Sequence, residues 1–159
     1  MKDEGGVKVD QTYYKQVVGS LMYLTATRLD MMFVVSLISR YMENPTEMHL
    51  QVAKRALRYL KGTTEFGIFY KKGGDEEFVA YTDSDYAGDL EDKKSTLGCV
   101  FLLSSGVVSW TYKKQPVVSL STTDAKFIAV ASCACQGIWL RKVLEKLGQK
   151  QEKVVSVFL

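Results

Sequence analysis

Two aspartates, Asp83 and Asp85, are the clearest candidates for chemistry in this chain. They stand two residues apart at the end of a run with the alternation of a β-strand, so both side chains are expected to point to one face. Two like charges held together are costly unless a cation neutralises them, and Mg²⁺ is a hard ion that carboxylates bind. The pair is therefore a candidate metal site, although Asp-x-Asp at the end of a strand also serves simple turns.

Other kinds of active site find little support. The single histidine, His49, cannot be catalytic base and metal ligand together, and it is expected to be structural or exposed. The cysteines Cys99, Cys133 and Cys135 lack Cys-x-x-Cys spacing, so neither a zinc site nor a disulfide framework is predicted, and free thiols are expected. No Ser-His-Asp set and no Gly-rich phosphate loop stands out.

A basic stripe of Lys54, Arg58 and Lys61 is the best local indication of a phosphate-facing surface. These residues share one side of a predicted helix, apart from its apolar residues. The net charge is only +3, so bulk charge supports nucleic-acid binding weakly. The alternative is that the stripe is simply the solvated face of an amphipathic helix.

The first third of the chain is predicted to be helical. Residues 1–11 are polar and read as a flexible start. From Tyr13 to Met42 the apolar residues recur at helical spacing, and two helices interrupted near residues 25–30 are the simplest interpretation. The next helix is expected to begin with Asn44 as its cap and Pro45 as its first residue, and to end at Gly62.

After Gly62 the hydrophobic period changes to two. Strands are predicted at about 66–70, 78–83, 96–103 and 107–113, with turns at 72–75 and 104–106 and a short extended stretch at 117–120. Ser121 or Thr122 is expected to cap a long helix that Gly148 closes, and residues 154–159 form a final β-rich run. The predicted class is α+β: a helical segment, then a mixed sheet of three antiparallel strands, a helix and a strand parallel to the first.

The composition is that of a globular domain with a real core: 159 residues, 47% hydrophobic and 25% charged. The charged N-terminus has no apolar signal region, and the apolar runs are far shorter than the roughly 20 residues of a bilayer span. We therefore expect no signal peptide, no transmembrane segment, no membrane partner and an intracellular location, cytoplasmic or nuclear.

Two groups of sequence runs stand out. The first is residues 81–89 (YTDSDYAGD), 94–96 (KST), 108–110 (VSW), 113–118 (KKQPVV) and 120–125 (LSTTDA), and the second is residues 18–28 (VGSLMYLTATR) and 53–63 (AKRALRYLKGT). The first group resembles the ribonuclease H domain in the Pol polyprotein of copia-type retrotransposons, and the second resembles the end of its reverse transcriptase. The resemblance implies a flexible N-terminus at 1–11, a helical reverse-transcriptase tail at 12–63 and a truncated ribonuclease H-like domain at 64–159.

The resemblance also implies a lost active site. The family cleaves the RNA strand of an RNA–DNA hybrid with two Mg²⁺ ions held by four acidic residues. The first of these corresponds to Asp83, with Asp85 nearby, but a family glutamate corresponds to Lys126, and the remaining two positions fall beyond Leu159. An inactive relic that binds no cofactor tightly is therefore expected, with Lys126 and Asp83 forming an ion pair instead.

The predicted function is that of a degenerate Pol fragment that retains weak binding to RNA–DNA hybrid or duplex nucleic acid. Its expected contacts are five basic residues: Lys54, Arg58, Lys61, Lys113 and Lys114. One alternative is a residual Mg²⁺-dependent ribonuclease H that holds its metal with Asp83, Asp85 and Asp89. The other is a repurposed interaction protein, because short fragments of this kind resemble RxLR effector-like proteins, although no Arg-x-Leu-Arg motif is expected near the start.

Overall fold

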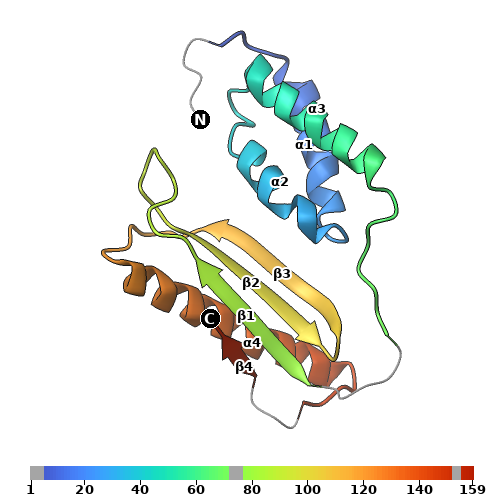
Figure 1. Cartoon of the computed structure of the whole chain (residues 1–159), viewed down its shortest axis with the longest axis vertical. Coiled ribbons are helices and arrows are strands. Elements are labelled where there is room, and N and C mark those ends of the chain that lie inside the picture. The colour runs from blue at the N-terminus through green and yellow to red at the C-terminus, as the bar shows by residue number, and fades with distance from the viewer. Residues whose placement is uncertain (1–5, 72–76, 152–154) are drawn as a thin grey trace. The chain divides into compact units, whose positions relative to one another are not determined.

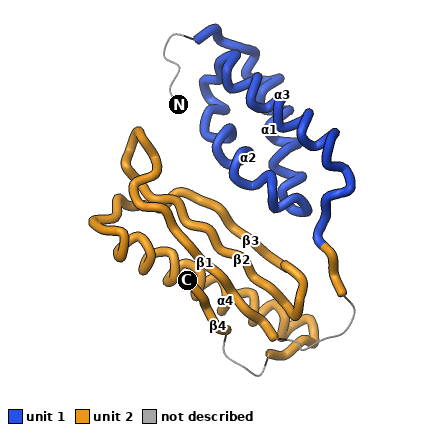
Figure 2. Tube along the Cα trace, viewed as in Figure 1, with its two compact units in different colours: residues 1–68 blue, residues 69–159 orange. Residues whose placement is uncertain are grey.

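The computed structural model describes residues 6–71, 77–151 and 155–159. The chain divides into two compact units, Met1–Ile68 and Phe69–Leu159, each with its own hydrophobic core (Figure 2). The boundary suggested by the sequence lay slightly earlier, between residues 63 and 64. Because the units pack separately, each is described by itself.

Unit 1 is helical. It contains α1 (Gln11–Leu24), the short 3₁₀ helix η1 (Leu29–Met31), α2 (Met32–Ser39) and α3 (Glu47–Gly62) (Figure 1). The interruption predicted near residues 25–30 is confirmed, and the Asp10 carboxylate starts α1 by accepting from the backbone N–H of Thr12 at 2.7 Å. The three α-helices share one core of Tyr14, Val18, Leu21, Met31, Val35, Ile38, Leu50, Ala53 and Ala56.

The start of α3 differs from the prediction, because Thr46 is its cap rather than Asn44. Residues 7–9 pair with residues 45–47: Glu47 N–H donates to Val7 O at 2.9 Å, and Val9 N–H donates to Pro45 O at 3.3 Å. This pairing keeps Pro45 outside the helix, and it also shows that the end of the segment predicted to be flexible is ordered. His49 is structural, since it is buried and its Nδ1 accepts from Thr46 N–H at 3.0 Å.

Unit 2 is a four-stranded mixed sheet covered on one face by a long helix, so the predicted α+β class and mixed sheet are confirmed. Its elements are β1 (Phe78–Ser84), β2 (Thr96–Leu103), β3 (Gly106–Lys114), α4 (Thr122–Lys146) and β4 (Ser156–Phe158) (Figure 1). The strand order is β3-β2-β1-β4, with β4 parallel to β1 and the other pairs antiparallel. Ser121 caps α4 through Asp124 N–H at 3.0 Å, and Gly148 follows the helix with a φ of +81°.

The core of unit 2 follows from the alternation of its strands. Phe78, Ala80 and Thr82 of β1 are buried, while Tyr81 and Asp83 are exposed on the other face. The buried face packs against α4 through the cluster of Phe78, Ala80, Leu97, Cys99, Phe101, Ala129 and Cys133.

The strand predicted at 66–70 is wrong, because these residues have no strand partner. Aromatic side chains, rather than a backbone ladder, hold this segment. The Arg28 guanidinium lies 5.8 Å from the centre of the Phe66 ring in unit 1. In unit 2, Tyr70 Oη donates to Val107 O at 2.8 Å. The segment at 117–120 is also not a strand, and the turn predicted at 72–75 lies outside the described residues.

One helix in the described part of the chain, α4, is long and apolar enough to cross a membrane by length and composition alone. No such segment was expected from the sequence, because the uninterrupted apolar runs are short, whereas α4 is apolar in its overall composition. In the structure α4 packs along the sheet through Ala125, Ala129, Cys133 and Gly137. Other apolar side chains of the same helix, Phe127, Ile138 and Trp139, are exposed.

Candidate functional site

Asp83 lies near the end of β1 on the sheet face opposite α4. Its neighbour Thr82 is buried and its Oγ1 lies 3.3 Å from Cys99 Sγ, within the core that α4 covers. Since successive side chains of a strand point to opposite faces, the carboxylate of Asp83 points away from α4. Its Oδ1 accepts from the backbone N–H of Ser84 at 2.8 Å.

Asp85 lies just beyond the end of β1 and closes the loop that follows. Its Oδ1 accepts from Thr96 N–H at 2.7 Å, and its own N–H donates to Thr96 O at 3.1 Å. A Cβ atom at Gly88 would collide with the Asp85 carboxylate, so a glycine is required at that point of the loop. Asp85 therefore has a structural role that its sequence spacing did not reveal.

Lys126 and Asp83 do not form the ion pair expected from the sequence. Lys126 lies in the first turn of α4 with an exposed side chain, next to buried Ala125. The physical reason is the alternation of β1, which directs Asp83 to the face that α4 does not cover. The nearby Asp124 is used for capping, because its Oδ2 accepts from Leu120 N–H at 2.9 Å.

Lys114 forms ion pairs with carboxylates of the loop that follows β1. Its Nζ lies 2.5 Å from Asp89 Oδ2 and 3.2 Å from Asp92 Oδ2. The Lys114 ammonium holds the pKa of the Asp89 carboxyl well below its usual range. Lys113 is exposed and points to the opposite face of the sheet, so the two lysines do not form one patch.

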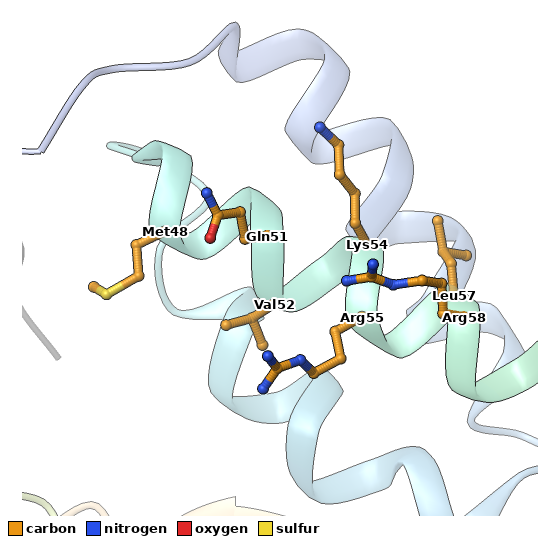
Figure 3. Close-up of a pocket in the computed structure, with 7 residues that line it drawn as sticks. All are labelled: Met48, Gln51, Val52, Lys54, Arg55, Leu57 and Arg58. Atoms are coloured by element: carbon orange, nitrogen blue, oxygen red, sulfur yellow. The ribbon is translucent and has the colours of Figure 1, made fainter.

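The basic stripe of α3 is larger than the sequence suggested. Lys54, Arg58 and Lys61 are exposed as predicted, and Arg55 is exposed beside them. Figure 3 shows Lys54, Arg55 and Arg58 lining one hollow along α3, where the Lys54 and Arg55 side chains diverge and the Arg58 guanidinium lies between them. We call these four cations the α3 basic face. Within the described part of the chain, none of them has a carboxylate partner.

Arg55 could have been found from spacing alone, because it precedes Arg58 by three residues and so shares its side of the helix. The same stretch, Arg55-Ala56-Leu57-Arg58, is an Arg-x-Leu-Arg sequence. It lies inside α3 rather than near the start of the chain, and Ala56 is buried in the core of unit 1. The motif is thus part of a packed helix.

No group of three or more His, Cys, Asp or Glu side chains converges as a metal site within residues 6–71, 77–151 and 155–159. The three carboxylates considered for residual metal binding are each engaged locally. Asp85 binds the Thr96 backbone, Asp89 pairs with Lys114, and Asp83 accepts from Ser84.

Comparison with known proteins identifies the family. The chain is 45% identical to the retrovirus-related Pol polyprotein from transposon RE1 of Arabidopsis thaliana and 42% identical to that from transposon TNT 1-94 of Nicotiana tabacum, over 87% and 89% of this chain. It spans only 10% and 11% of those proteins. It is also 39% identical to "Secreted RxLR effector protein 161" of Plasmopara viticola, over 80% of this chain and 90% of that protein.

This chain therefore belongs to the Pol polyprotein family of copia-type retrotransposons, of which it represents a fragment. It spans about a tenth of the length of the Pol polyproteins it matches. No family model and no solved structure matches it.

Proposed function

We propose that this Pol fragment binds RNA–DNA hybrid or duplex nucleic acid weakly through the α3 basic face and does not cleave it. The observation that carries the proposal is the grouping of Lys54, Arg55, Arg58 and Lys61 on one exposed side of α3, without carboxylate partners among the described residues. Unneutralised cations of this kind bind the phosphate backbone and displace its counterions.

The spacing of these residues suits contacts to the phosphate backbone of a nucleic acid rather than contacts to its bases. Lys54, Arg58 and Lys61 follow one another at intervals of four and three residues, which correspond to rises of about 6 and 4.5 Å along a helix. Consecutive cations can therefore contact successive phosphates of one strand. Such contacts carry no sequence information, so binding should depend on charge and salt rather than on sequence.

A ribonuclease H-like assignment of unit 2 is supported by the resemblance of its motifs together with the order of its elements, three antiparallel strands, a helix and a parallel strand. Its residues do not fit the two-Mg²⁺ site of that family. Lys126 places a cation where the family has a glutamate, Asp85 is bound to the Thr96 backbone, and Asp83 points away from α4. We therefore assign no metal-dependent step to these residues and infer that hybrid is bound without turnover.

Fluorescence anisotropy with labelled RNA–DNA hybrid, duplex DNA and duplex RNA tests the proposal. With three to five phosphate contacts, the logarithm of the affinity should fall against the logarithm of the salt concentration with a slope of about −3 to −4. Dissociation constants should lie at about 10⁻⁴–10⁻⁶ M at physiological salt. Absence of salt-dependent binding by a monodisperse sample would refute the proposal.

A second candidate is an interaction protein, and one observation favours it. The relative named as a secreted RxLR effector matches this chain over 90% of its own length, so a protein of nearly this extent exists under that name. The Arg-x-Leu-Arg sequence of this chain lies within α3, where Ala56 contributes to the core. Under this reading, the fragment would show no salt-dependent affinity for nucleic acid, and the same anisotropy titration separates the two candidates.

A further inference from the structure

Two of the three cysteines meet in the interior of unit 2. Cys99 on β2 is 2% exposed and Cys133 on α4 is 0% exposed, and both belong to the core between sheet and helix. The two thiols are neighbours within this cluster, and Thr82 Oγ1 lies 3.3 Å from Cys99 Sγ. Cys135 is exposed and belongs to neither side of this contact. The chain thus holds one matched pair of thiols and one separate thiol.

The surroundings make the two thiols unequal. The contact with Cys133, together with the Thr82 hydroxyl and the charge of Lys113, lowers the pKa of the Cys99 thiol. The same contact, and then burial, raise the pKa of the Cys133 thiol. A proton shared by the pair therefore stays on Cys133, and Cys99 is the sulfur that reacts as a thiolate.

We propose that Cys99 and Cys133 are a redox modification site, in which a peroxide converts the pair into a reversible disulfide that joins β2 to α4. The Cys99 thiolate attacks one oxygen of hydrogen peroxide and becomes a sulfenic acid, while hydroxide leaves. The Cys133 sulfur then attacks Cys99 Sγ, so that an S–S bond forms, the S–O bond breaks and water leaves. Two thiols and one peroxide thus give one disulfide and two waters, and a dithiol reductant reverses the change.

Burial determines how this site behaves. Peroxide reaches the buried Cys99 only when α4 opens locally from the sheet, so the pair should oxidise more slowly than exposed Cys135. Once formed, the disulfide closes a loop that contains β3 and the first half of α4, and it restricts the unfolded chain. The oxidised protein should therefore unfold at a temperature about 5–10 °C higher than the reduced protein.

The experiment uses the full chain and a Cys135→Ser variant, which removes the exposed thiol without touching the core. After peroxide treatment and alkylation of free thiols, non-reducing peptide mapping should show the Cys99 and Cys133 peptides linked, with the loss of two hydrogen atoms, reversed by dithiothreitol. Thermal unfolding of the oxidised and reduced forms of the same protein then needs no substitution in the core. The proposal would be overturned if Cys99 and Cys133 both remain free thiols, or if a link forms through Cys135 instead. An unchanged or lower Tm after oxidation would also overturn it.

Discussion

Lys114 Nζ lies 2.5 Å from Asp89 Oδ2, and this ion pair connects the end of β3 to the loop that follows β1. The Asp89 side chain is only 10% exposed, and its Oδ1 also accepts from the backbone N–H of Glu91 at 2.9 Å. The same carboxylate therefore shapes its own loop and anchors it to the sheet. Lys114 also contacts Asp92, at 3.2 Å.

The ion pair predicts how the stability of unit 2 depends on pH. The pKa of Asp89 is lowered from 3.8 in the folded state, so its contribution is present above that value and is lost as the pH falls through the folded pKa. The pKa of Lys114 is raised from 10.5, so its contribution is present below that value and is lost as the pH rises through the folded pKa. Between these limits the contribution should be constant.

Asp89→Asn tests this dependence because it removes the charge but keeps the acceptor for the Glu91 N–H. At neutral pH we expect a Tm lower by about 2–4 °C, since a single ion pair contributes modestly. The difference from the unchanged protein should shrink below about pH 4, where the Asp89 carboxyl of the unfolded chain binds a proton while the folded carboxyl, with its lowered pKa, stays ionised. A difference in Tm that stays constant down to pH 2 would show that charge is not its cause.

The α3 basic face predicts a specific loss of binding. The triple change Lys54→Ala, Arg55→Ala and Arg58→Ala should reduce the magnitude of the salt slope by about 2–3, because each lost phosphate contact removes about 0.9 from it. A matched control removes the same charge from exposed lysines of unit 2 by changing Lys142, Lys146 and Lys150 to Ala. The control should leave the slope nearly unchanged. Equal effects of the two triple variants would mean that only net charge matters.

We expect that the Lys126→Glu variant will not cleave RNA–DNA hybrid in the presence of Mg²⁺ or Mn²⁺. The new carboxylate would stand on α4, whereas Asp83 points to the other face of the sheet and Asp85 is bound to the Thr96 backbone. Too few oxygens would converge to hold two metal ions. The measurement is cleavage of a labelled RNA–DNA hybrid, with Lys126→Gln as the matched control. Cleavage by the glutamate variant that disappears when Asp83→Asn is added would show that this assignment is wrong.

Because Tyr70 packs against Gly106, substitutions at these two positions should have non-additive effects on stability. A Cβ atom at Gly106 would lie 2.6 Å from Tyr70 Cδ1, so Gly106→Ala must displace the ring and weaken the hydrogen bond to Val107 O. We expect Gly106→Ala to lower the free energy of unfolding by about 1–3 kcal/mol. Much of that loss should vanish in a Tyr70→Ala background, where no ring is left to displace. Additive effects in denaturant unfolding of the single and double variants would contradict the contact.

Features that depend on nearby residues could be read from the sequence. The cap at Ser121 and the closing glycine at 148 act within a few residues of α4, and the alternation of residues 78–83 places apolar side chains on one face. Helical spacing likewise indicates three members of the α3 basic face, and the fourth, Arg55, has the same signal because it precedes Arg58 by three residues. The family motifs likewise depend on order along the chain.

Local reasoning failed where a distant partner decides the outcome. Pro45 suits the first turn of a helix, but its pairing with Val9 holds it outside α3. Residues 66–70 have the pattern of a strand, yet the described structure provides no neighbouring strand for them, and their aromatic rings are held by separate contacts. Each of these partners is far away in sequence, so no local pattern contains it.

The family, the α+β class and the basic helix α3 were predictable from the residues alone, as was the order of the elements apart from the strand expected at 66–70. How the chemically interesting residues are used depends on the folded chain. Asp83 and Lys126 are separated by the two faces of the sheet, Asp85 is bound to the Thr96 backbone, and Lys114 is neutralised by Asp89. The physical reason is that side-chain chemistry depends on the groups within a few ångströms, and those groups come from segments that only folding brings together.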